Sequence, residues 1–171
     1  MVYDLEKENK EILARYKDLI TNTYRTLDED NNKLIRKAFD IALDAHKDQR
    51  RKTGEPYIYH PIEVAKIVAN ELGLGATSIA CALLHDVIED SDYTYEDIEK
   101  IFNKKIADIV NGLTKISVMN NQNISIQSEN YRKLLLTLSE DFRVILIKIA
   151  DRLHNMRTLE SMRPDKQKKI A

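Results

Sequence analysis

The sequence has little of what secreted or membrane proteins require. Its single cysteine, Cys81, cannot form a disulfide within the chain, so nothing indicates an oxidising compartment. The longest apolar runs, Ile79–Leu84 and Val144–Ile147, fall far short of the roughly 20 residues that span a bilayer. The N-terminus has no basic segment followed by an apolar one and is therefore not typical of a signal peptide. We expect a cytoplasmic protein that does not enter a membrane.

The chain also lacks an excess of either charge. It has 27 Lys and Arg against 28 Asp and Glu, a formal net charge of −1, whereas general nucleic-acid binders usually carry a basic excess. We therefore expect this domain to bind no nucleic acid itself. Its 171 residues fit a single domain, 1–171, with residues 1–27 as an N-terminal helical extension. Residues 168–171 carry no helix-terminating signal, so we expect a C-terminus truncated from a longer protein.

Glycine and proline are scarce as well. Four Gly and three Pro provide too few turns for a strand-rich fold. Apolar residues instead recur at three- and four-residue spacing, which predicts an all-α fold, a helical bundle of about eight helices. A polar loop is expected at 117–128, and Thr94 with Asp97 resembles a capping box. The expected helices cover residues 3–24, 28–48, 61–72, 76–89, 94–103, 104–116, 129–138 and 140–162.

Polar side chains gather at the end of the apolar helix expected over 76–89. His85 and Asp86 follow six apolar residues, and Glu89 and Asp90 come four positions later, one helical turn along the same helix. Burying polar groups there is costly unless something satisfies them. Carboxylates this close also repel one another unless a cation or a proton intervenes. We therefore favour a metal site over a solvated helix end.

Two further segments carry candidate ligands. Asp151 ends an apolar run and shares a helical face with Asn155 and Thr158, a pattern that by itself also fits an ordinary amphipathic helix. His60 precedes Pro61 and would, alone, be a structural hydrogen-bonding residue. Together, two imidazoles and two carboxylates form a donor set without thiolate, which suits Mn²⁺ or Fe²⁺ better than structural Zn²⁺. The candidate metal ligands are His60, His85, Asp86 and Asp151.

The order of these four residues resembles the HD metal-dependent phosphohydrolase superfamily. Over about residues 33–171 the chain resembles one branch closely, the N-terminal hydrolase domain of the RelA/SpoT family of bacterial alarmone, (p)ppGpp, synthetase/hydrolases. The matching segments are Ala45–Lys47, Arg51–Pro61, Leu84–Asp90, Gly112–Lys115 and Ala150–Thr158. The resemblance implies an all-helical enzyme that holds one Mn²⁺ per chain on those four ligands. It would remove the 3′-diphosphate of ppGpp or pppGpp to give GDP or GTP and pyrophosphate.

The resemblance also implies roles for other residues. Glu89 and Asp90 match an acidic pair that orients and deprotonates the attacking water. Arg51, Lys52 and Thr53 match a loop at the nucleotide site, with Thr53 standing where the family commonly has Ser. Asn155 and Thr158 match positions that hold the nucleotide. The segment 47–52 has four basic residues and one acidic residue, which suits a polyphosphate substrate.

Two histidines in the matching segments receive no metal role, His46 and His154. His154 lies three residues after Asp151 and could orient that carboxylate from behind. Members of the family usually continue with a synthetase domain and regulatory domains. The resemblance therefore implies that the full-length protein contains these domains.

Two alternatives stay open. The chain could be an HD phosphohydrolase that acts on another 3′- or 5′-phosphorylated nucleotide, although the basic loop and the acidic pair favour the alarmone. It could instead be a catalytically silent regulatory module that keeps the fold. Degenerate domains of this family typically lose metal ligands, whereas all four are present here together with both acids. That favours an active enzyme.

Overall fold

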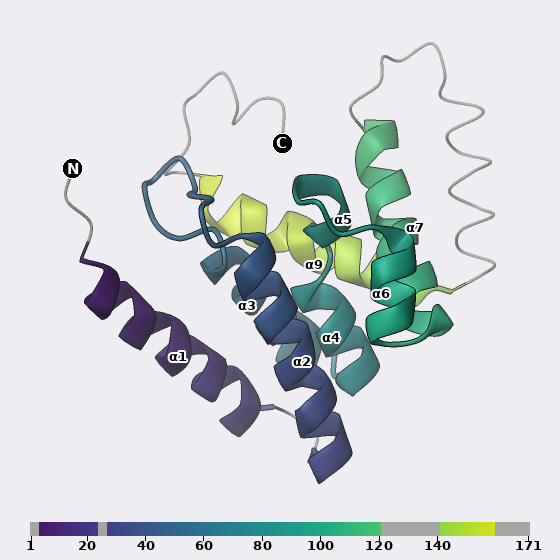
Figure 1. Ribbon diagram of the computed structural model, residues 1–171, viewed down its shortest axis with the longest axis horizontal. Helices are drawn as coiled ribbons and strands as arrows, with labels where there is room; N and C mark the ends of the chain where they lie inside the picture. Colours follow the sequence, from purple (N-terminus) through teal and green to yellow (C-terminus); the bar gives the residue numbers. More distant parts are fainter. Residues whose placement is uncertain (1–3, 24–26, 121–140, 160–171) are drawn as a thin grey trace.

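The computed structural model describes residues 4–23, 27–120 and 141–159, and over these residues the protein is helical (Figure 1). The one β-type feature of the described ranges is an isolated bridge between Arg50 and Pro56. The all-α prediction is therefore confirmed. The elements are α1 (Leu5–Thr21), α2 (Glu29–Ala45), α3 (Tyr59–Lys66) with the π-helical turn η1 (Ile67–Glu71), α4 (Ala76–Leu83), α5 (Val87–Asp90), α6 (Tyr95–Ile101), α7 (Lys104–Asn120) and α9 (Arg143–Arg157).

Side-chain caps set the start of three helices, as their sequences indicate. The Asp4 carboxylate accepts a hydrogen bond from the Lys7 amide at the start of α1, and Asp28 accepts one from the Asn31 amide at the start of α2. At α6 the Thr94 hydroxyl accepts from the Asp97 amide, and the Asp97 carboxylate accepts from the Thr94 amide. The predicted capping box is therefore confirmed.

Helix α4 lies at the centre of the bundle because it is apolar on nearly every side. It packs against α2, α3, α7 and α9, while α1 lies at one edge of the molecule and α6 and α7 at the other (Figure 1). All but one of its residues from Ile79 to Leu83 are 0% exposed, and Ile79 is 1% exposed. Chain segments that meet around the C-terminal end of α4 can therefore place side chains in a buried site.

The helix predicted over 76–89 is wrong in one respect, because it is interrupted. Helix α4 ends at Leu83, residues 84–86 form a turn, and the short helix α5 begins at Val87. The turn is closed by a hydrogen bond from the Val87 amide to the Leu84 carbonyl, while the His85 ring takes the Ala82 carbonyl as its partner. Glu89 and Asp90 therefore do not continue the helix that precedes His85 and Asp86.

Other helix boundaries also differ from the predictions. Helix α7 continues to Asn120, so the loop predicted from residue 117 does not begin there. The helix predicted over 61–72 begins at Tyr59 and finishes in the π-helical turn, which the Leu72 amide closes on the Ile67 carbonyl. The predicted helix 129–138 lies outside the described residues, as does the chain beyond residue 159.

The central position of α4 yields a prediction about stability. Leu83→Ala would remove a fully buried side chain and leave a cavity, which typically costs about 2–5 kcal/mol of unfolding free energy. Leu13→Ala is the matched control, since Leu13 is 52% exposed on α1 and its loss should change stability by less than about 1 kcal/mol. Urea denaturation measures both. Equal losses would contradict the central role of α4.

Candidate metal centre and nucleotide site

Three separate parts of the chain bring the four candidate ligands together. His60 comes from the start of α3, His85 and Asp86 from the turn after α4, and Asp151 from α9. His60 Nε2 lies 3.2 Å from Asp151 Oδ1, and His85 Nε2 lies 2.9 Å from Asp86 Oδ2. The crossed distances, His60 to Asp86 and His85 to Asp151, are 3.9 and 3.8 Å. All four residues are buried, at 1 to 9% exposure.

The fold delivers these polar groups into the core on otherwise apolar elements. Pro61 occupies the first turn of α3, where a missing amide hydrogen costs nothing, and His60 stands directly before it. On α9, Val144, Ile147 and Ala150 face the core, and Asp151 lies beside them on the same buried face. Because α3 packs against both α4 and α9, the apolar packing brings the four ligands to one point.

Contacts behind the ligands fix the orientation of three of them. His85 Nδ1 lies 2.7 Å from the Ala82 carbonyl. A carbonyl only accepts, so the imidazole donates from Nδ1 and its Nε2 faces the other ligands. The Tyr57 hydroxyl donates to Asp86 Oδ2 at 2.6 Å. On the other side of the cluster, Asp151 accepts a hydrogen bond from Asn155 Nδ2 at 2.8 Å. Such second contacts tune and orient metal ligands.

His154 was expected to orient Asp151, and the structure shows that this is wrong, because His154 contacts His60 instead. Its Nδ1 lies 2.7 Å from Nδ1 of His60, so the ring orients His60. Asp151 is instead held by Asn155 and by Lys148, whose Nζ is 2.8 Å from the second carboxylate oxygen. Burial, together with the nearby His60 and Arg51, lowers the pKa of His154 to about 4. A neutral ring at this position can share one proton with His60 without adding charge.

The buried carboxylates remain ionised because positive charge surrounds them. Burial opposes ionisation of Asp86, but the charge of His85 outweighs it and holds the pKa of that carboxyl well below its usual range. Burial also opposes the charge of Asp151, where a hydrogen bond with His60 and the charges of His85 and Lys148 depress the pKa. For His85 burial acts against protonation, yet the charges of Asp86 and Asp151 raise its pKa to about 9. The cluster therefore stabilises positive charge at its centre.

The donor set fits a divalent cation. His60, His85 and Asp86 each offer a ligand atom, and these atoms lie within 4.8 Å of one another. His85 Nε2 is buried and makes no hydrogen bond within the described residues, although Asp86 Oδ2 lies 2.9 Å away. A buried polar atom in this state is rare and calls for an explanation. Mixed imidazole and carboxylate donors bind borderline divalent metals. A cation at the centre would satisfy both the orphaned nitrogen and the two carboxylates.

The acidic pair lies next to this cluster on α5. Both Glu89 and Asp90 are solvent-exposed. Although Asp90 as a whole residue is exposed, its carboxyl group is partly desolvated, and this desolvation, followed by the charge of Asp86, raises its pKa. The Asp90 carbonyl accepts a hydrogen bond of 2.5 Å from Gln49 Nε2, and Gln49 Oε1 lies 2.9 Å from Nδ1 of the buried His46. His46, which was given no metal role, thus helps to hold α5 in place.

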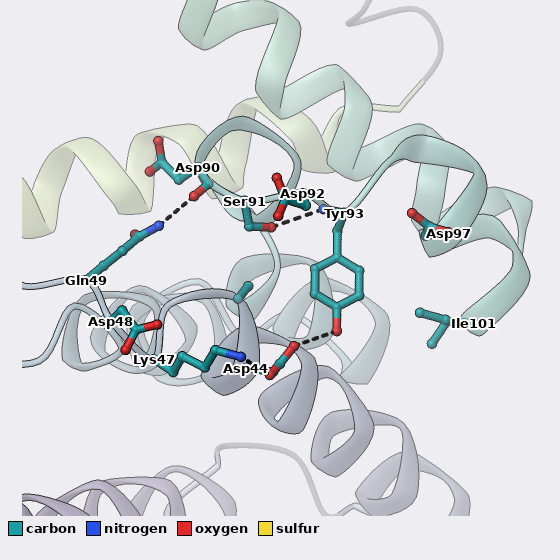
Figure 2. A pocket seen from close by; sticks show the side chains of 11 residues that line it. Asp44, Lys47, Asp48, Gln49, Asp90, Ser91, Asp92, Tyr93, Asp97 and Ile101 are labelled. Carbon is teal, nitrogen blue, oxygen red and sulfur yellow. Dashed lines mark hydrogen bonds and ion pairs between the residues drawn. The ribbon is translucent and has the colours of Figure 1, made fainter.

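Figure 2 shows the outer side of this contact, where Gln49 reaches Asp90 at the rim of a cavity of about 630 Å³. Five aspartates and one lysine line the cavity, together with Tyr93, whose hydroxyl donates to Asp44 at 3.0 Å. A lining with this balance of charge repels phosphate. The cavity is therefore unsuited to an anionic ligand.

The basic loop forms a tight turn before α3. The Gly54 amide donates to the Arg51 carbonyl at 2.8 Å, and the Arg51 amide donates to the Glu55 carbonyl at 2.9 Å. Gly54 has a φ of 92°, a conformation that residues with a Cβ rarely adopt. Lys52 and Thr53 are exposed at the tip.

Arg51 connects this loop to α9. Its Nη2 donates to Asn155 Oδ1 at 3.2 Å, and Asn155 in turn donates to Asp151. Two of the predicted nucleotide residues therefore touch each other and border the candidate ligands. Thr158 lies at the end of α9, where its hydroxyl donates to the carbonyls of His154 and Asn155.

Sequence reasoning missed two residues of this site. Tyr57 lies within a matching segment, but nothing in its spacing indicates that its hydroxyl reaches Asp86 across 29 positions. Lys148 lies three residues before Asp151, a spacing at which oppositely charged side chains on a helix meet. The sequence spacing could therefore have indicated the Lys148–Asp151 ion pair.

Comparison with known proteins identifies the family of the chain. The family model for the HD domain matches residues 38–171. The chain belongs to the HD domain family. The resemblance indicated by the sequence motifs is also confirmed among individual proteins. The chain is 49% identical over 146 residues to the bifunctional (p)ppGpp synthase/hydrolase SpoT of Escherichia coli K12. It is 50% identical over 137 residues to the guanosine-3′,5′-bis(diphosphate) 3′-pyrophosphohydrolase of Aquifex aeolicus.

These HD-domain relatives are much longer than the present chain. The matches cover 85% and 80% of this chain but only 21% and 19% of the two relatives. A solved structure of a metazoan orthologue of SpoT that hydrolyses ppGpp matches with a TM-score of 0.65 and 27% identity, over 85% of this chain and 82% of that one. Within the described parts of the chain, no helix is long and apolar enough to cross a membrane.

The HD-domain site yields a prediction about metal content. The wild-type chain, dialysed after loading with Mn²⁺, should retain one ion, while Asp86→Ala should lose most of it because a charged ligand is gone. Asp92→Ala removes a nearby exposed carboxylate and serves as the control. Elemental analysis counts the ion. Excess metal should also raise the melting temperature of wild type, since a ligand at about 100 times its Kd stabilises a fold by about 2.7 kcal/mol.

If the Asp86→Ala chain kept as much metal as wild type, the proposed ligand set would be wrong. The same conclusion would follow if Asp92→Ala lost metal to the same extent.

Proposed function

We propose that this chain hydrolyses the 3′-diphosphate of ppGpp and pppGpp, giving GDP or GTP and pyrophosphate. The observation that carries the proposal is the convergence of His60, His85, Asp86 and Asp151 beside an acidic pair and an Arg51–Asn155 contact. Relatives at 49–50% identity carry the name of this activity. Because the proposed substrate is an intracellular nucleotide, we also place the activity in the cytoplasm.

The four ligands are proposed to hold one Mn²⁺. Their mixed nitrogen and oxygen donors suit a metal of borderline hardness, and the orphaned Nε2 of His85 supports an ion at this point. When bound, such an ion supplies Lewis acidity, which neutralises charge on phosphoryl oxygens and lowers the pKa of water. Hydrolysis also requires a proton acceptor and a substrate held in place, and other side chains provide these.

Asp90 is the proposed proton acceptor for the attacking water. It lies beside the ligand cluster, and partial burial and the charge of Asp86 raise its pKa. A carboxylate whose pKa is closer to the working pH is a better general base. Glu89, its neighbour on α5, is exposed and is proposed to orient the same water.

Arg51, Lys52, Thr53, Asn155 and Thr158 are proposed to bind the nucleotide. The flat guanidinium of Arg51 suits stacking on a guanine face, while Lys52 suits a phosphate as a point charge. The Arg51–Asn155 contact places this group next to the residue that orients Asp151. Base recognition and the reacting phosphate would thus be held a fixed distance apart.

The direct test is incubation with ppGpp and Mn²⁺, with and without a chelator, followed by nucleotide separation. GDP and pyrophosphate should appear only with the metal. A parallel incubation with a guanosine 3′-monophosphate distinguishes the alarmone from other 3′-phosphorylated nucleotides. Failure to form GDP, or release of monophosphate from ppGpp, would contradict the proposal.

The proposed base yields a second prediction. Both variants keep shape, but Asp90→Asn cannot accept the proton and Glu89→Gln loses the charge that orients the water. Each should therefore retain metal and bind substrate while losing roughly 10²–10⁴-fold in kcat. Asp92→Asn, two residues further on and exposed, should keep the wild-type rate. Steady-state kinetics alongside metal analysis decide the matter. Near-wild-type rates in both variants, or a loss explained by missing metal, would refute the assignment.

The nucleotide loop yields a third prediction. Arg51→Ala should raise KM about tenfold or more with little effect on kcat at saturation, because a charged hydrogen bond contributes about 1.5–3 kcal/mol to binding. Lys47→Ala removes the same charge from the same segment, where Lys47 pairs with Asp44, and should leave KM unchanged. A fall in kcat alone would mean that Arg51 acts on the transition state.

A further inference from the structure

Helix α1 lies outside the region that the HD domain family model matches, residues 38–171. It nevertheless reaches the basic loop. The Glu8 carboxylate meets the Arg50 guanidinium in a two-pronged ion pair, with Oε1 on Nη1 and Oε2 on Nη2, each at 2.8 Å. The two side chains are only 19% and 26% exposed. Paired N–H donors and carboxylate oxygens fix orientation as well as distance.

Arg50 continues the connection across the loop. Its Nη1 also donates to the Gly54 carbonyl at 2.8 Å. The three proposed nucleotide residues of the loop, 51–53, therefore lie between Arg50 and Gly54, which this hydrogen bond ties together. We call this arrangement the Glu8–Arg50–Gly54 clamp.

The rest of α1 is anchored independently of the clamp. Arg15 pairs with Glu63 of α3 at 3.0 Å and lies over the Tyr59 ring at 4.3 Å. Tyr16 stacks on Phe39 of α2 with ring centroids 4.3 Å apart. Ile12 and Leu19 are buried beneath the helix. Glu8 therefore lies on a helix that other contacts hold in place. Replacing Glu8 should leave α1 packed against α2 and α3.

We propose that Glu8 is a positioning residue for the nucleotide site. Through Arg50 it holds the loop 51–54 in the conformation that binds substrate, so that binding does not have to order the loop; this rests on the proposed function. Pre-ordering of a binding segment improves affinity because less freedom is lost on binding. Glu8 has no contact with the candidate metal ligands or the acidic pair in the described structure, so the effect should fall on KM.

The sign of the change in KM separates this role from a simple charge effect. Glu8→Gln removes one negative charge near a site for a polyanion, which by attraction alone would lower KM. Loss of the clamp should instead raise KM, by about fivefold, with kcat within about twofold of wild type. Arg50→Lys keeps the charge but cannot reach Glu8 and Gly54 with one planar group, and should also raise KM.

Glu63→Gln is the matched control. It also removes one negative charge and one ion pair of α1, together with a contact to Lys66 within α3, at a carboxylate of similar exposure, 28% against 19%. It should leave KM unchanged, although both variants should lower the melting temperature. Amide hydrogen exchange of Arg51 and Gly54, whose amides close the turn, should speed up in Glu8→Gln and remain at the wild-type rate in Glu63→Gln.

These two measurements give distinct outcomes. If loop exchange is unchanged in Glu8→Gln, the clamp does not order the loop and the proposal is overturned. If exchange speeds up but KM is unchanged or lower, or if Glu63→Gln raises KM equally, the positioning role is overturned. If wild type does not hydrolyse ppGpp, the proposed function fails, and hydrogen exchange alone still decides whether Glu8 orders the loop.

Discussion

The arrangement depends on two ionised carboxylates that the fold buries together. Asp86 and Asp151 are 9% and 7% exposed, and an unpaired buried charge is among the most destabilising features a protein can contain. Neighbouring side chains compensate the two charges. Two imidazoles stand between them, Lys148 meets Asp151 from outside, and Tyr57 donates to Asp86. The two carboxylates place negative charge at one buried point. A divalent cation neutralises that charge better than a shared proton does.

The basic loop is connected to the same carboxylates. Asn155 touches Asp151 with its amide nitrogen and Arg51 with its amide oxygen, so one side chain links the ligand cluster to the basic loop. The loop is then tied back to α1 through Arg50 and Glu8. A chain of direct contacts thus runs from the core to a peripheral helix. The cavity beside Gln49, which Asp90 also lines, carries five aspartates and one lysine and repels anions.

Much of this could be predicted from the sequence because the relevant signals are local. Scarcity of glycine and proline and three- and four-residue periodicity predict the helices, and the Thr94–Asp97 pattern predicts its cap. Convergence of the ligands follows from motif resemblance. The break after Leu83 could not be predicted, since the apolar pattern continues through Leu84 and the break depends on His85 bonding back to Ala82. Three contacts could not be predicted for a related reason, because they span 29 to 94 positions of the sequence. They are the Tyr57–Asp86 hydrogen bond, the His60–His154 contact and the Glu8–Arg50 ion pair.

Anomalous diffraction from crystals of the chain soaked in Mn²⁺ addresses the ligand cluster most directly. We expect a single strong anomalous peak enclosed by His60, His85, Asp86 and Asp151. We expect none in the acidic cavity beside Asp44 and Asp92, where carboxylates are abundant but histidine ligands are absent from the lining residues. A peak in that cavity with none between the two imidazoles would contradict the assignment of the metal centre, and with it the proposed hydrolysis.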